Sequence, residues 1–437
     1  MPRLIDIPEN LFPRKILSEI TQYIDGPEII LLVGARQVGK TSVLYLLMDE
    51  FIKRGTPEKS ILYFDLEDLN VLDIFNSGVK GFISYLSALG NDIKGRLYIF
   101  VDEIQYMDNP ANFLKLIADH HKNLKLIVSG SSTLEIRQKF KDSLAGRKVV
   151  FEIYPLDFYE FLVFKKEKTL CDALLKSDIR HITQKTEAAN IPARFFIDDM
   201  ARYFNEYLIF GGYPRIVIEA GHDKKVSYLM DIYTSYVKKD IKDIMRIDNV
   251  TAFNNLLKAL ALQTGSLVNI TELCGAVKLA RETLERYLFL LENTFIIKTV
   301  TPFSSNPRKE ISKMSKVYFV DTGLRNIVIR NFNNPDERSD IGALVENCVC
   351  CNLIKNLAPL EEIHFWRTLA KNEVDFVLVK GEKISPVEVK YTAFKSSRVP
   401  LGIRYFQKDY ESDEGVVLTK DYFGKAERAI FLPAWLC

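Results

Sequence analysis

Short apolar runs alternate with helical stretches over the first 165 residues of the chain. A strand that is buried on both faces is apolar throughout, so this alternation predicts a parallel β-sheet with helices on both sides. Ligands of such sheets bind beyond the carboxyl ends of the strands. The predicted strands are Ile29–Val33, Ile61–Asp65, Leu97–Val101, Leu124–Ser129 and Val149–Ile153.

Beyond the fifth predicted strand the pattern becomes mainly helical. Asp157–Lys168 and the charged stretch to about Ile191 have helical character, and Gly211–Pro214 is a strong breaker between helical segments. These features predict a helical lid or connector over residues 166–248, after an α/β core of residues 1–165.

Residues 249–330 have the element order of a winged helix-turn-helix, which is three helices followed by a β-hairpin. A final α/β segment begins near Ile341, and we assign it to a C-terminal domain of residues 331–437. The predicted fold class is therefore α/β, with a helical and a winged-helix part between two α/β domains. The predicted helices are Thr251–Gln263, Asn269–Val277 and Ala280–Asn293, and the hairpin strands are Phe295–Pro302 and Lys316–Val320.

The composition is that of a soluble globular protein, with 47% hydrophobic and 27% charged residues. The net charge of +2 gives no global basic field, so any nucleic-acid surface must be local. No apolar run approaches the roughly 18 residues of a membrane span, and we expect no membrane partner. The six cysteines lack zinc-site spacing, so a reduced, cytoplasmic protein is expected. Cys348, Cys350 and Cys351 should pack as small hydrophobes on one helix.

A phosphate-binding loop (P-loop) follows the first predicted strand. Residues 34–41 match Gly-x-x-x-x-Gly-Lys-Ser/Thr without a mismatch, between an apolar strand and a helical stretch. Gly34 and Gly39 allow the tight bend in which successive N–H groups form an anion nest. Lys40 is expected to reach the outer phosphates and Thr41 to ligate Mg²⁺. The predicted nucleotide-binding residues are Gly34, Ala35, Arg36, Gln37, Val38, Gly39, Lys40, Thr41 and Ser42.

An acidic pair, Asp102 and Glu103, ends the third predicted strand. In a nucleotide hydrolase, Asp102 would hold Mg²⁺ and Glu103 would orient and polarise the attacking water. The alternative is a strand that merely ends in acidic residues, but the P-loop upstream favours the hydrolase. A guanine-reading Asn-Lys-x-Asp string has only a partial match at Thr419–Asp421, so ATP is the expected nucleotide.

The acidic pair resembles that of AAA+ ATPases. The resemblance implies a polar sensor residue in the segment Ser129–Ser132, and we assign Ser131 to it. It also implies an arginine finger, which supplies positive charge to the transition state, with Arg147 in the string SLAGR as the candidate. Such a finger serves its own chain or a neighbouring subunit of a homo-oligomer. The alternative is a surface arginine paired with Asp142 or Glu152.

A second constellation of charged residues lies in the last hundred residues. Glu346 is in a helical stretch, Asp375 is in a strand, and Glu388 and Lys390 are two apart on the next strand, so they share a face. Converging acids suit a hard divalent cation, Mg²⁺ or Mn²⁺, and the lysine can help water to attack a phosphodiester. The alternatives are an ordinary charged hairpin and an inactive site that is retained as an interaction surface.

The order of these four residues resembles the PD-(D/E)XK nuclease fold. The chain as a whole resembles prokaryotic AAA+ ATP-binding proteins with a C-terminal domain of unknown function (family 4143), through motifs that occur in order from residue 34 to 391. The resemblance implies an ATPase core, a winged helix and a restriction-endonuclease-like terminus. The motifs are GARQVGKT, FVDEIQ, SLAGR, GGYP, YFVDTGL, GALVEN, FWR, EVDF and VEVKY.

Two classes of function fit these features of the sequence. The first is an ATP-dependent enzyme that acts on double-stranded DNA, which the winged helix would contact through basic residues. The second is a nucleotide-operated signalling switch or scaffold with an inactive nuclease-like domain. Glu282, Glu285 and Glu292 balance the basic residues and weaken the case for DNA. Those basic residues are Lys278, Arg281 and Arg286, with Arg308, Lys309 and Lys313 in the wing turn.

Overall fold

The computed structural model describes residues 7–131, 144–177, 191–235, 247, 249–304, 314–426 and 428–437. The chain forms two compact units, and each is described separately. Unit 1 comprises Met1–Tyr154 and Asn293–Phe295, and unit 2 comprises Pro155–Glu292 and Ile296–Cys437. None of the helices in the described ranges combines the length and the apolar character that crossing a membrane requires.

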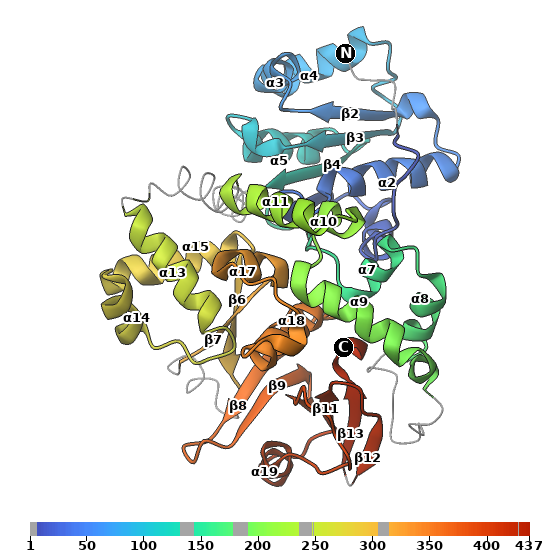
Figure 1. The fold of residues 1–437 in the computed structure, drawn as a ribbon. Coiled ribbons are helices and arrows are strands. Elements are labelled where there is room, and N and C mark those ends of the chain that lie inside the picture. Colours follow the sequence, from blue (N-terminus) through green and yellow to red (C-terminus); the bar gives the residue numbers. More distant parts are fainter. Residues whose placement is uncertain are drawn as a thin grey trace. The chain divides into compact units, whose positions relative to one another are not determined.

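Unit 1 contains a five-stranded sheet in the order β2-β3-β4-β1-β5, of which β2, β3 and β4 are labelled in Figure 1. Every paired strand in it is parallel, which confirms the predicted parallel sheet. The strands are β1 (Ile29–Gly34), β2 (Ile61–Asp65), β3 (Leu97–Asp102), β4 (Leu124–Ser131) and β5 (Lys148–Glu152). The helices are α1 (Leu17–Ile20), α2 (Lys40–Lys53), α3 (Leu69–Asn76), α4 (Gly78–Ala88) and α5 (Pro110–His120), with the 3₁₀ turns η1 (Thr21–Tyr23), η2 (Glu58–Ser60) and η3 (Ile104–Tyr106).

Aromatic side chains attach the helices to opposite faces of this sheet. Phe51 of α2 packs against Phe100 of β3, with ring centroids 5.9 Å apart. Phe64 of β2 packs against Phe75 of α3 on the other face, because Phe100 is in register with Tyr63, the neighbour of Phe64. Each buried phenylalanine stabilises the fold by about 1.5–3 kcal/mol. The sheet is thereby fixed between α2 and the α3–α5 layer.

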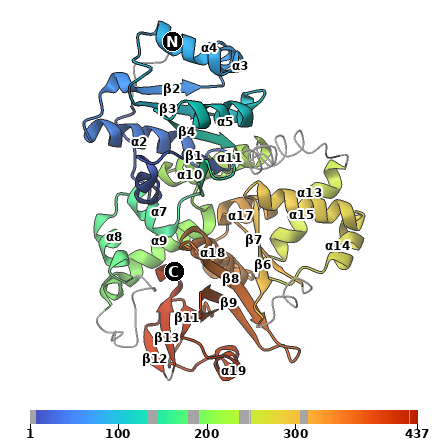
Figure 2. The ribbon, with the colours of Figure 1, turned by 180° about the vertical axis from the view of Figure 1, so that it is seen from behind.

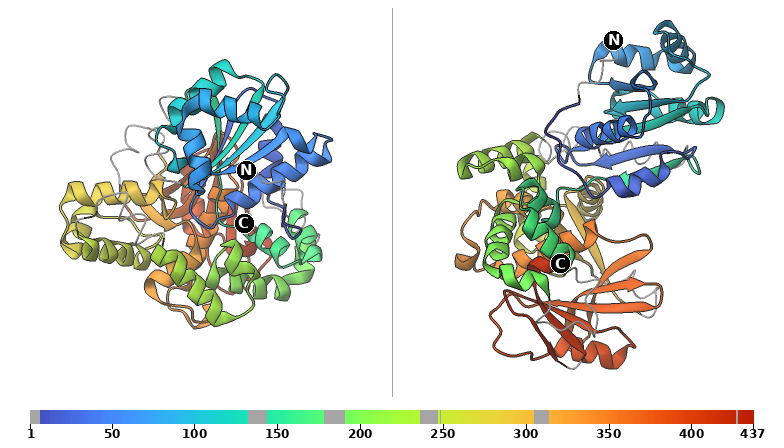
Figure 3. Two further views of the ribbon diagram at one scale, coloured as in Figure 1. Left: turned by 90° about the horizontal axis from the view of Figure 1, so that it is seen from above. Right: turned by 90° about the vertical axis from the view of Figure 1, so that its right-hand side faces the viewer.

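Unit 2 contains an eight-stranded mixed sheet in the order β12-β13-β11-β10-β9-β8-β6-β7. Figure 2 shows it from behind, and Figure 3 shows its strands, coloured from yellow through orange to red, from two further directions. The strands are β6 (Ile297–Pro302), β7 (Lys316–Phe319), β8 (Glu361–Arg367), β9 (Glu373–Lys380), β10 (Lys383–Val389), β11 (Gly415–Thr419), β12 (Gly424–Ala426) and β13 (Ala429–Pro433).

The helices of unit 2 precede and interrupt this sheet. The first group is α7 (Phe158–Phe164), α8 (Lys168–Leu175), α9 (Ile197–Phe210), α10 (Pro214–Ile218) and α11 (His222–Ile232), with η5 (Pro192–Phe196). The second group is α13 (Val250–Leu262), α14 (Ile270–Val277) and α15 (Arg281–Asn293). The third group is α17 (Thr322–Ile329), α18 (Ile341–Lys355) and α19 (Leu401–Asp409), with η7 (Pro335–Glu337) and η8 (Ala434–Leu436).

The predicted hairpin and the C-terminal strands share one sheet rather than forming separate domains. β6 pairs antiparallel with β7 and parallel with β8, through Thr301–His364 and Pro302–Phe365. The three segments predicted as lid, winged helix and C-terminal domain thus fall in one compact unit. Unit 1 ends at Tyr154 rather than at the predicted residue 165, because α7 packs with α8 and α9 into the core of unit 2.

Gly211, Gly212 and Gly323 bring the loop before α10 against the start of α17, and a Cβ atom on Gly323 would lie 2.1 Å from the Phe210 carbonyl oxygen. Gly211 has a φ of +73°, and a Cβ atom there would lie 2.1 Å from Asp321 Oδ1. A Cβ on Gly212 would lie 2.1 Å from the Leu156 carbonyl oxygen. Asp321 instead accepts hydrogen bonds from the N–H groups of Gly212, at 2.7 Å, and Leu324, at 2.9 Å. The motifs GGYP and YFVDTGL therefore meet in the fold, and their glycines serve packing.

We expect Gly212→Ala to destabilise the protein by about 1–3 kcal/mol or more, because the methyl group would overlap a backbone oxygen. Gly275→Ala is the matched control, since a Cβ at this position in α14 meets nothing within 4 Å. That control should stabilise the helix by about 0.5–1 kcal/mol. Urea unfolding followed by circular dichroism measures both changes. Equal midpoints for the two variants would show that the contact at Gly212 is not tight.

Candidate functional site

The P-loop joins the end of β1 to the start of α2, as predicted. Gln37 and Gly39 have left-handed φ values of 61° and 93°. Such backbone turns direct neighbouring N–H groups toward one point and form an anion nest. A Cβ on Gly34 would lie 2.2 Å from the Ile153 carbonyl oxygen, so only glycine lets β1 approach the segment after β5. Buried Arg14 also contacts the loop, because its guanidinium donates a hydrogen bond to the Val38 carbonyl oxygen at 2.9 Å.

Lys40 lies across this loop rather than in solvent. Its side chain is only 5% exposed, and Nζ donates to the carbonyl oxygens of Gly34 at 3.2 Å and Ala35 at 3.0 Å. Burial lowers the pKa of Lys40, while the carboxylates of Glu103 and Asp102 act in the opposite direction. The ammonium is therefore already held at the loop where a phosphate would lie.

Asp102 is the centre of a hydrogen-bond network at the carboxyl end of the sheet. Its Oδ2 accepts from Thr41 Oγ1 at 2.6 Å and from the Tyr63 hydroxyl at 3.1 Å. Its Oδ1 accepts from the Ser129 hydroxyl. Burial and the charge of Asp102 raise the pKa of Tyr63, which keeps that hydroxyl a donor. The structure thus brings the two predicted Mg²⁺ ligands, Thr41 and Asp102, together.

Glu103 lies directly beside this network. Its backbone is left-handed, with a φ of 56°, and its N–H donates to Asp102 Oδ1 at 3.1 Å and to Ser129 Oγ at 3.3 Å. Its carboxylate accepts from Gln105 Nε2, and Gln105 Oε1 in turn accepts from the Ser131 N–H at 3.1 Å. The second predicted acid is therefore connected to the end of β4.

Three residues of this network are not among the site residues that the sequence predicted, namely Tyr63, Ser129 and Gln105. Ser129 precedes the predicted sensor Ser131 by two positions on β4, so the two side chains share a face, and strand alternation offered a signal for it. Ser131 itself is in register with Gly34 at the start of the P-loop. Its role as sensor stays a prediction.

Arg147, the predicted arginine finger, lies at the amino ends of the strands, whereas the P-loop lies at their carboxyl ends. The Arg147 carbonyl oxygen accepts from the N–H of Ile29, the first residue of β1, whereas the P-loop follows the last. At about 3.3 Å per strand residue, the two ends are roughly 16 Å apart. Its guanidinium pairs with Asp119 of α5, at 2.6 Å, and not with Glu152. A role toward the P-loop of its own chain does not fit this arrangement, and a role toward a neighbouring subunit stays a prediction. Ser143 and Asp142 lie outside the described residues.

The four charged residues predicted near the C-terminus converge in unit 2. Asp375 of β9 accepts at Oδ2 from the N–H of Val389, the residue between Glu388 and Lys390. Lys390 Nζ lies 2.6 Å from Glu388 Oε1. Burial, then the charge of Asp375, raise the pKa values of Glu346 and Glu388 to about 7. Burial also raises the pKa of Asp375. The structure thus brings these side chains together, and their role as a nuclease site stays a prediction.

Lys316 of β7 is a further member of this cluster that the sequence did not reveal. Its Nζ lies 2.6 Å from Glu373 Oε1, 3.1 Å from Glu346 Oε1 and 3.9 Å from Asp375 Oδ1. Tyr318 of the same strand donates to Glu346 Oε1 at 2.7 Å. Burial alone would lower the pKa of Lys316, but the carboxylates outweigh it and raise that pKa. Across the described ranges, no group of three or more His, Cys, Asp or Glu side chains is arranged to hold a metal ion.

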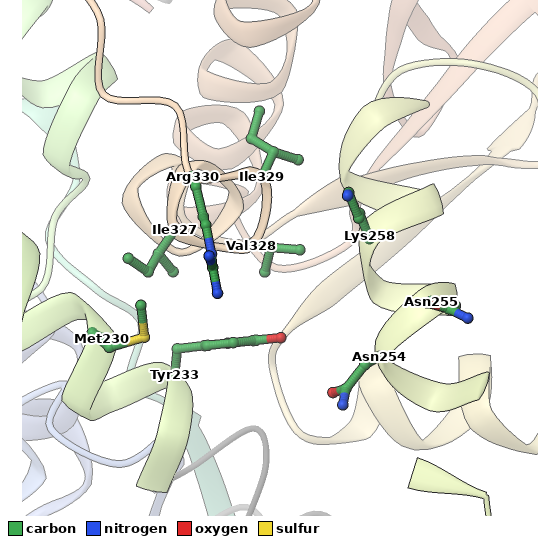
Figure 4. Close-up of a pocket in the computed structure, with 9 residues that line it drawn as sticks. All are labelled: Met230, Tyr233, Asn254, Asn255, Lys258, Ile327, Val328, Ile329 and Arg330. Atoms are coloured by element: carbon green, nitrogen blue, oxygen red, sulfur yellow. The ribbon is translucent and has the colours of Figure 1, made fainter. Parts of the chain in front are cut away.

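The other features of unit 2 bear on the predicted DNA surface and on the cysteines. On α15, Arg281 pairs with Glu285 at 2.8 Å, so part of the predicted basic surface is neutralised. Arg308, Lys309 and Lys313 lie outside the described residues. Cys348, Cys350 and Cys351 are buried on α18 and form no disulfide bond, as predicted. A separate cavity of about 290 Å³ lies between α11, α13 and the end of α17, and none of the residues above lines it (Figure 4).

Three segments of the chain match models of known protein families. Residues 26–162 match the model of an AAA domain, and residues 341–435 match a domain of unknown function (DUF4143). Residues 201–335 match a second domain of unknown function (DUF8612). The AAA match covers the P-loop, Asp102 and Glu103, and the DUF4143 match covers Glu346, Asp375, Glu388 and Lys390.

Relatives of similar length occur in bacteria and archaea. An uncharacterized protein of Haemophilus influenzae is 22% identical over 96% of this chain and 97% of its own length. An uncharacterized protein of Methanocaldococcus jannaschii is 26% identical over 83% of this chain and 75% of its own. Among solved structures, a Walker-type ATPase of Pyrococcus abyssi is 15% identical over 75% of this chain and all of its own, with a TM-score of 0.42. The family matches show that the chain contains an AAA domain, a DUF8612 domain and a C-terminal DUF4143 domain.

Proposed function

We propose that this protein hydrolyses ATP at the P-loop and that the nucleotide state controls unit 2 as a switch. The position of Asp102 is the observation that supports hydrolysis best. Its carboxylate contacts Thr41 at the start of α2 and Ser129 on β4, and Glu103 follows it directly. A phosphate-binding loop, a hydroxyl–carboxylate pair and a second carboxylate are the parts that NTP-hydrolysing sites share.

The residues present fit a nucleoside triphosphate with Mg²⁺. The nest of N–H groups at Gln37 and Gly39, the start of α2 and the buried ammonium of Lys40 offer donors and positive charge to phosphate oxygens. Thr41 and Asp102 would hold Mg²⁺, which when bound neutralises charge on those oxygens. Lys40 would exchange its two loop carbonyls for phosphate oxygens.

Glu103 would accept a hydrogen bond from the attacking water and orient it. Ser129 and Gln105 position this acid, Ser129 through the Glu103 N–H and Gln105 through its carboxylate. Because Gln105 also accepts from the Ser131 N–H, a shift at the end of β4 would change the direction of the Glu103 carboxylate. Through this linkage, a nucleotide-dependent movement at the end of β4 would change the rate of hydrolysis, and hydrolysis would in turn affect that movement.

We expect Lys40→Ala to abolish ATP turnover, because it removes the buried cation of the loop. Glu103→Gln should keep ATP binding within about threefold and lower turnover by roughly 10²–10³-fold, since it removes only the group that orients water. Phosphate release and isothermal titration calorimetry measure the two quantities. Lys53→Ala is the matched control, because Lys53 lies on the same helix with an exposed side chain paired to Asp49. Turnover that survives in Lys40→Ala would place hydrolysis elsewhere.

Ser129→Ala should lower ATP turnover by roughly 10-fold to 100-fold without changing the dissociation constant of ATP more than about threefold. The serine hydroxyl contacts Asp102 and the Glu103 N–H rather than the P-loop, so its loss should disturb the acids and not the nest. Ser87→Ala on α4 is the control, because its hydroxyl only caps a carbonyl within its own helix. An unchanged turnover in Ser129→Ala would exclude a positioning role for this residue.

A second candidate function is metal-dependent cleavage of double-stranded DNA by the C-terminal cluster. The convergence of Glu346, Asp375, Glu388 and Lys390 favours it, together with one carboxylate oxygen, Glu388 Oε2, that is buried without a hydrogen-bond partner among the described residues. A hard cation binds such oxygens. The pairing of Arg281 with Glu285 speaks against a strong DNA surface on α15.

If the cluster cleaves DNA, wild-type protein should nick supercoiled plasmid in Mn²⁺ or Mg²⁺, and Lys390→Ala should remove that activity. The assay is run with and without ATP, with Lys383→Ala at the start of β10 as a control of equal charge change. Nicking that persists in Lys390→Ala would indicate a contaminant or another site. No nicking under any of these conditions would leave the ATP-operated switch as the function of this half.

A further inference from the structure

Lys316 is the most deeply buried cation of the C-terminal cluster. Its side chain is 2% exposed, although it lies on β7, at the edge of the sheet and outside the helix–strand–strand series that supplies the four predicted residues. Its ammonium lies closest to Glu373 and Glu346, with Asp375 a little further away at 3.9 Å. A buried ammonium is tolerated only where carboxylates compensate for its lost hydration.

The charges of the cluster nearly balance without a metal ion. Four carboxylates, those of Glu346, Glu373, Asp375 and Glu388, face three cations. Lys316 lies between the first three, and Lys390 pairs with Glu388 at 2.6 Å. Arg367 of β8 lies 3.1 Å from the second oxygen of Glu373. A divalent cation added to this set would create excess positive charge in a buried place.

Several carboxylate oxygens of the cluster already accept hydrogen bonds or face an ammonium group. Oε1 of Glu346 faces Lys316 and accepts from the Tyr318 hydroxyl. Oδ2 of Asp375 accepts from the Val389 N–H, and its Oδ1 faces Lys316. Of the carboxylate oxygens of this cluster, Glu388 Oε2 is buried without a hydrogen-bond partner among the described residues. A Mg²⁺ or Mn²⁺ ion needs several oxygens around one point, so these residues do not fit such an ion while Lys316 is in place.

We propose that Lys316 is the resident cation of this cluster and takes the place that a divalent metal ion would need. The cluster then acts as an ionic joint that ties β7 to α18 and β9, and it excludes metal as long as β7 keeps its position. β7 is the last strand in the sheet order; it pairs with β6, and Lys316 also forms an isolated antiparallel bridge with Leu267. Release of β7 from these contacts would withdraw the ammonium and expose the carboxylates. This inference holds whether or not the P-loop hydrolyses ATP, and it opposes metal-dependent cleavage by this cluster while β7 keeps its position.

The experiment measures Mn²⁺ binding to the nucleotide-free full chain by electron paramagnetic resonance of free Mn²⁺. All proteins carry Asp102→Asn, which removes a carboxylate ligand of the P-loop site. This parent should show no Mn²⁺ site that depends on Asp375. Lys316→Met should gain one site, at least tenfold tighter than any site of the parent, and a further Asp375→Asn should remove it. Lys316→Arg, which keeps the charge, should behave as the parent does.

Two results would overturn the proposal. One is a parent protein whose Mn²⁺ binding is lost in Asp375→Asn, since metal and Lys316 would then occupy the cluster together. The other is a folded Lys316→Met that gains no Mn²⁺ site. If Lys316→Met does not fold, the comparison of the parent with its Asp375→Asn variant still decides the question. A rise of the melting temperature with Mn²⁺ in Lys316→Met, absent in the parent, is the second readout.

Discussion

The nucleotide site depends on one buried carboxylate, that of Asp102. Three elements donate hydrogen bonds to it, namely α2 through Thr41, β2 through Tyr63 and β4 through Ser129. Hydrogen bonds to an ionised acceptor are about twice as strong as neutral ones, and an unpaired buried charge is costly, so these contacts constrain all three elements at once. The P-loop at the start of α2 is thereby fixed relative to Glu103 and the end of β4.

Unit 2 uses the opposite arrangement, a buried cation among acids. Lys316 is held by carboxylates from α18 and β9, and the strand that carries it belongs to the same sheet as the C-terminal strands. An ionic joint of this kind is specific in geometry even where its net stabilisation is small, because breaking one partner leaves an uncompensated charge. It therefore suits an element that must hold one position until something displaces it.

Local patterns in the sequence were sufficient to predict the parallel sheet and the position of the P-loop. The five apolar runs became five parallel strands, and the motif of residues 34–41 became a nest at the predicted edge of the sheet, because both depend on neighbouring residues. Asp102 and Glu103 were identifiable from the strand that precedes them. The four charged residues of the last domain also lie together in unit 2.

What the sequence did not reveal depends on contacts between distant segments. Tyr63 and Lys316 carry no local signal, since their roles arise only from strand order and register. Arg147 lies in a recognisable string. Its pairing with Asp119 and its place at the amino ends of the strands, however, follow from the parallel pairing of β1 with β5. The shared sheet of β6 and β8 likewise joins segments that the sequence divides into two domains.

The most direct test of the account is the dependence of ATP binding on Mg²⁺, measured by calorimetry in wild type and in Asp102→Asn. If Asp102 and Thr41 hold the metal ion, wild type should bind ATP more tightly with Mg²⁺ than with EDTA. Asp102→Asn should bind metal-free ATP with similar affinity and lose most of the gain from Mg²⁺. An equal gain from Mg²⁺ in both proteins would contradict the central role of Asp102.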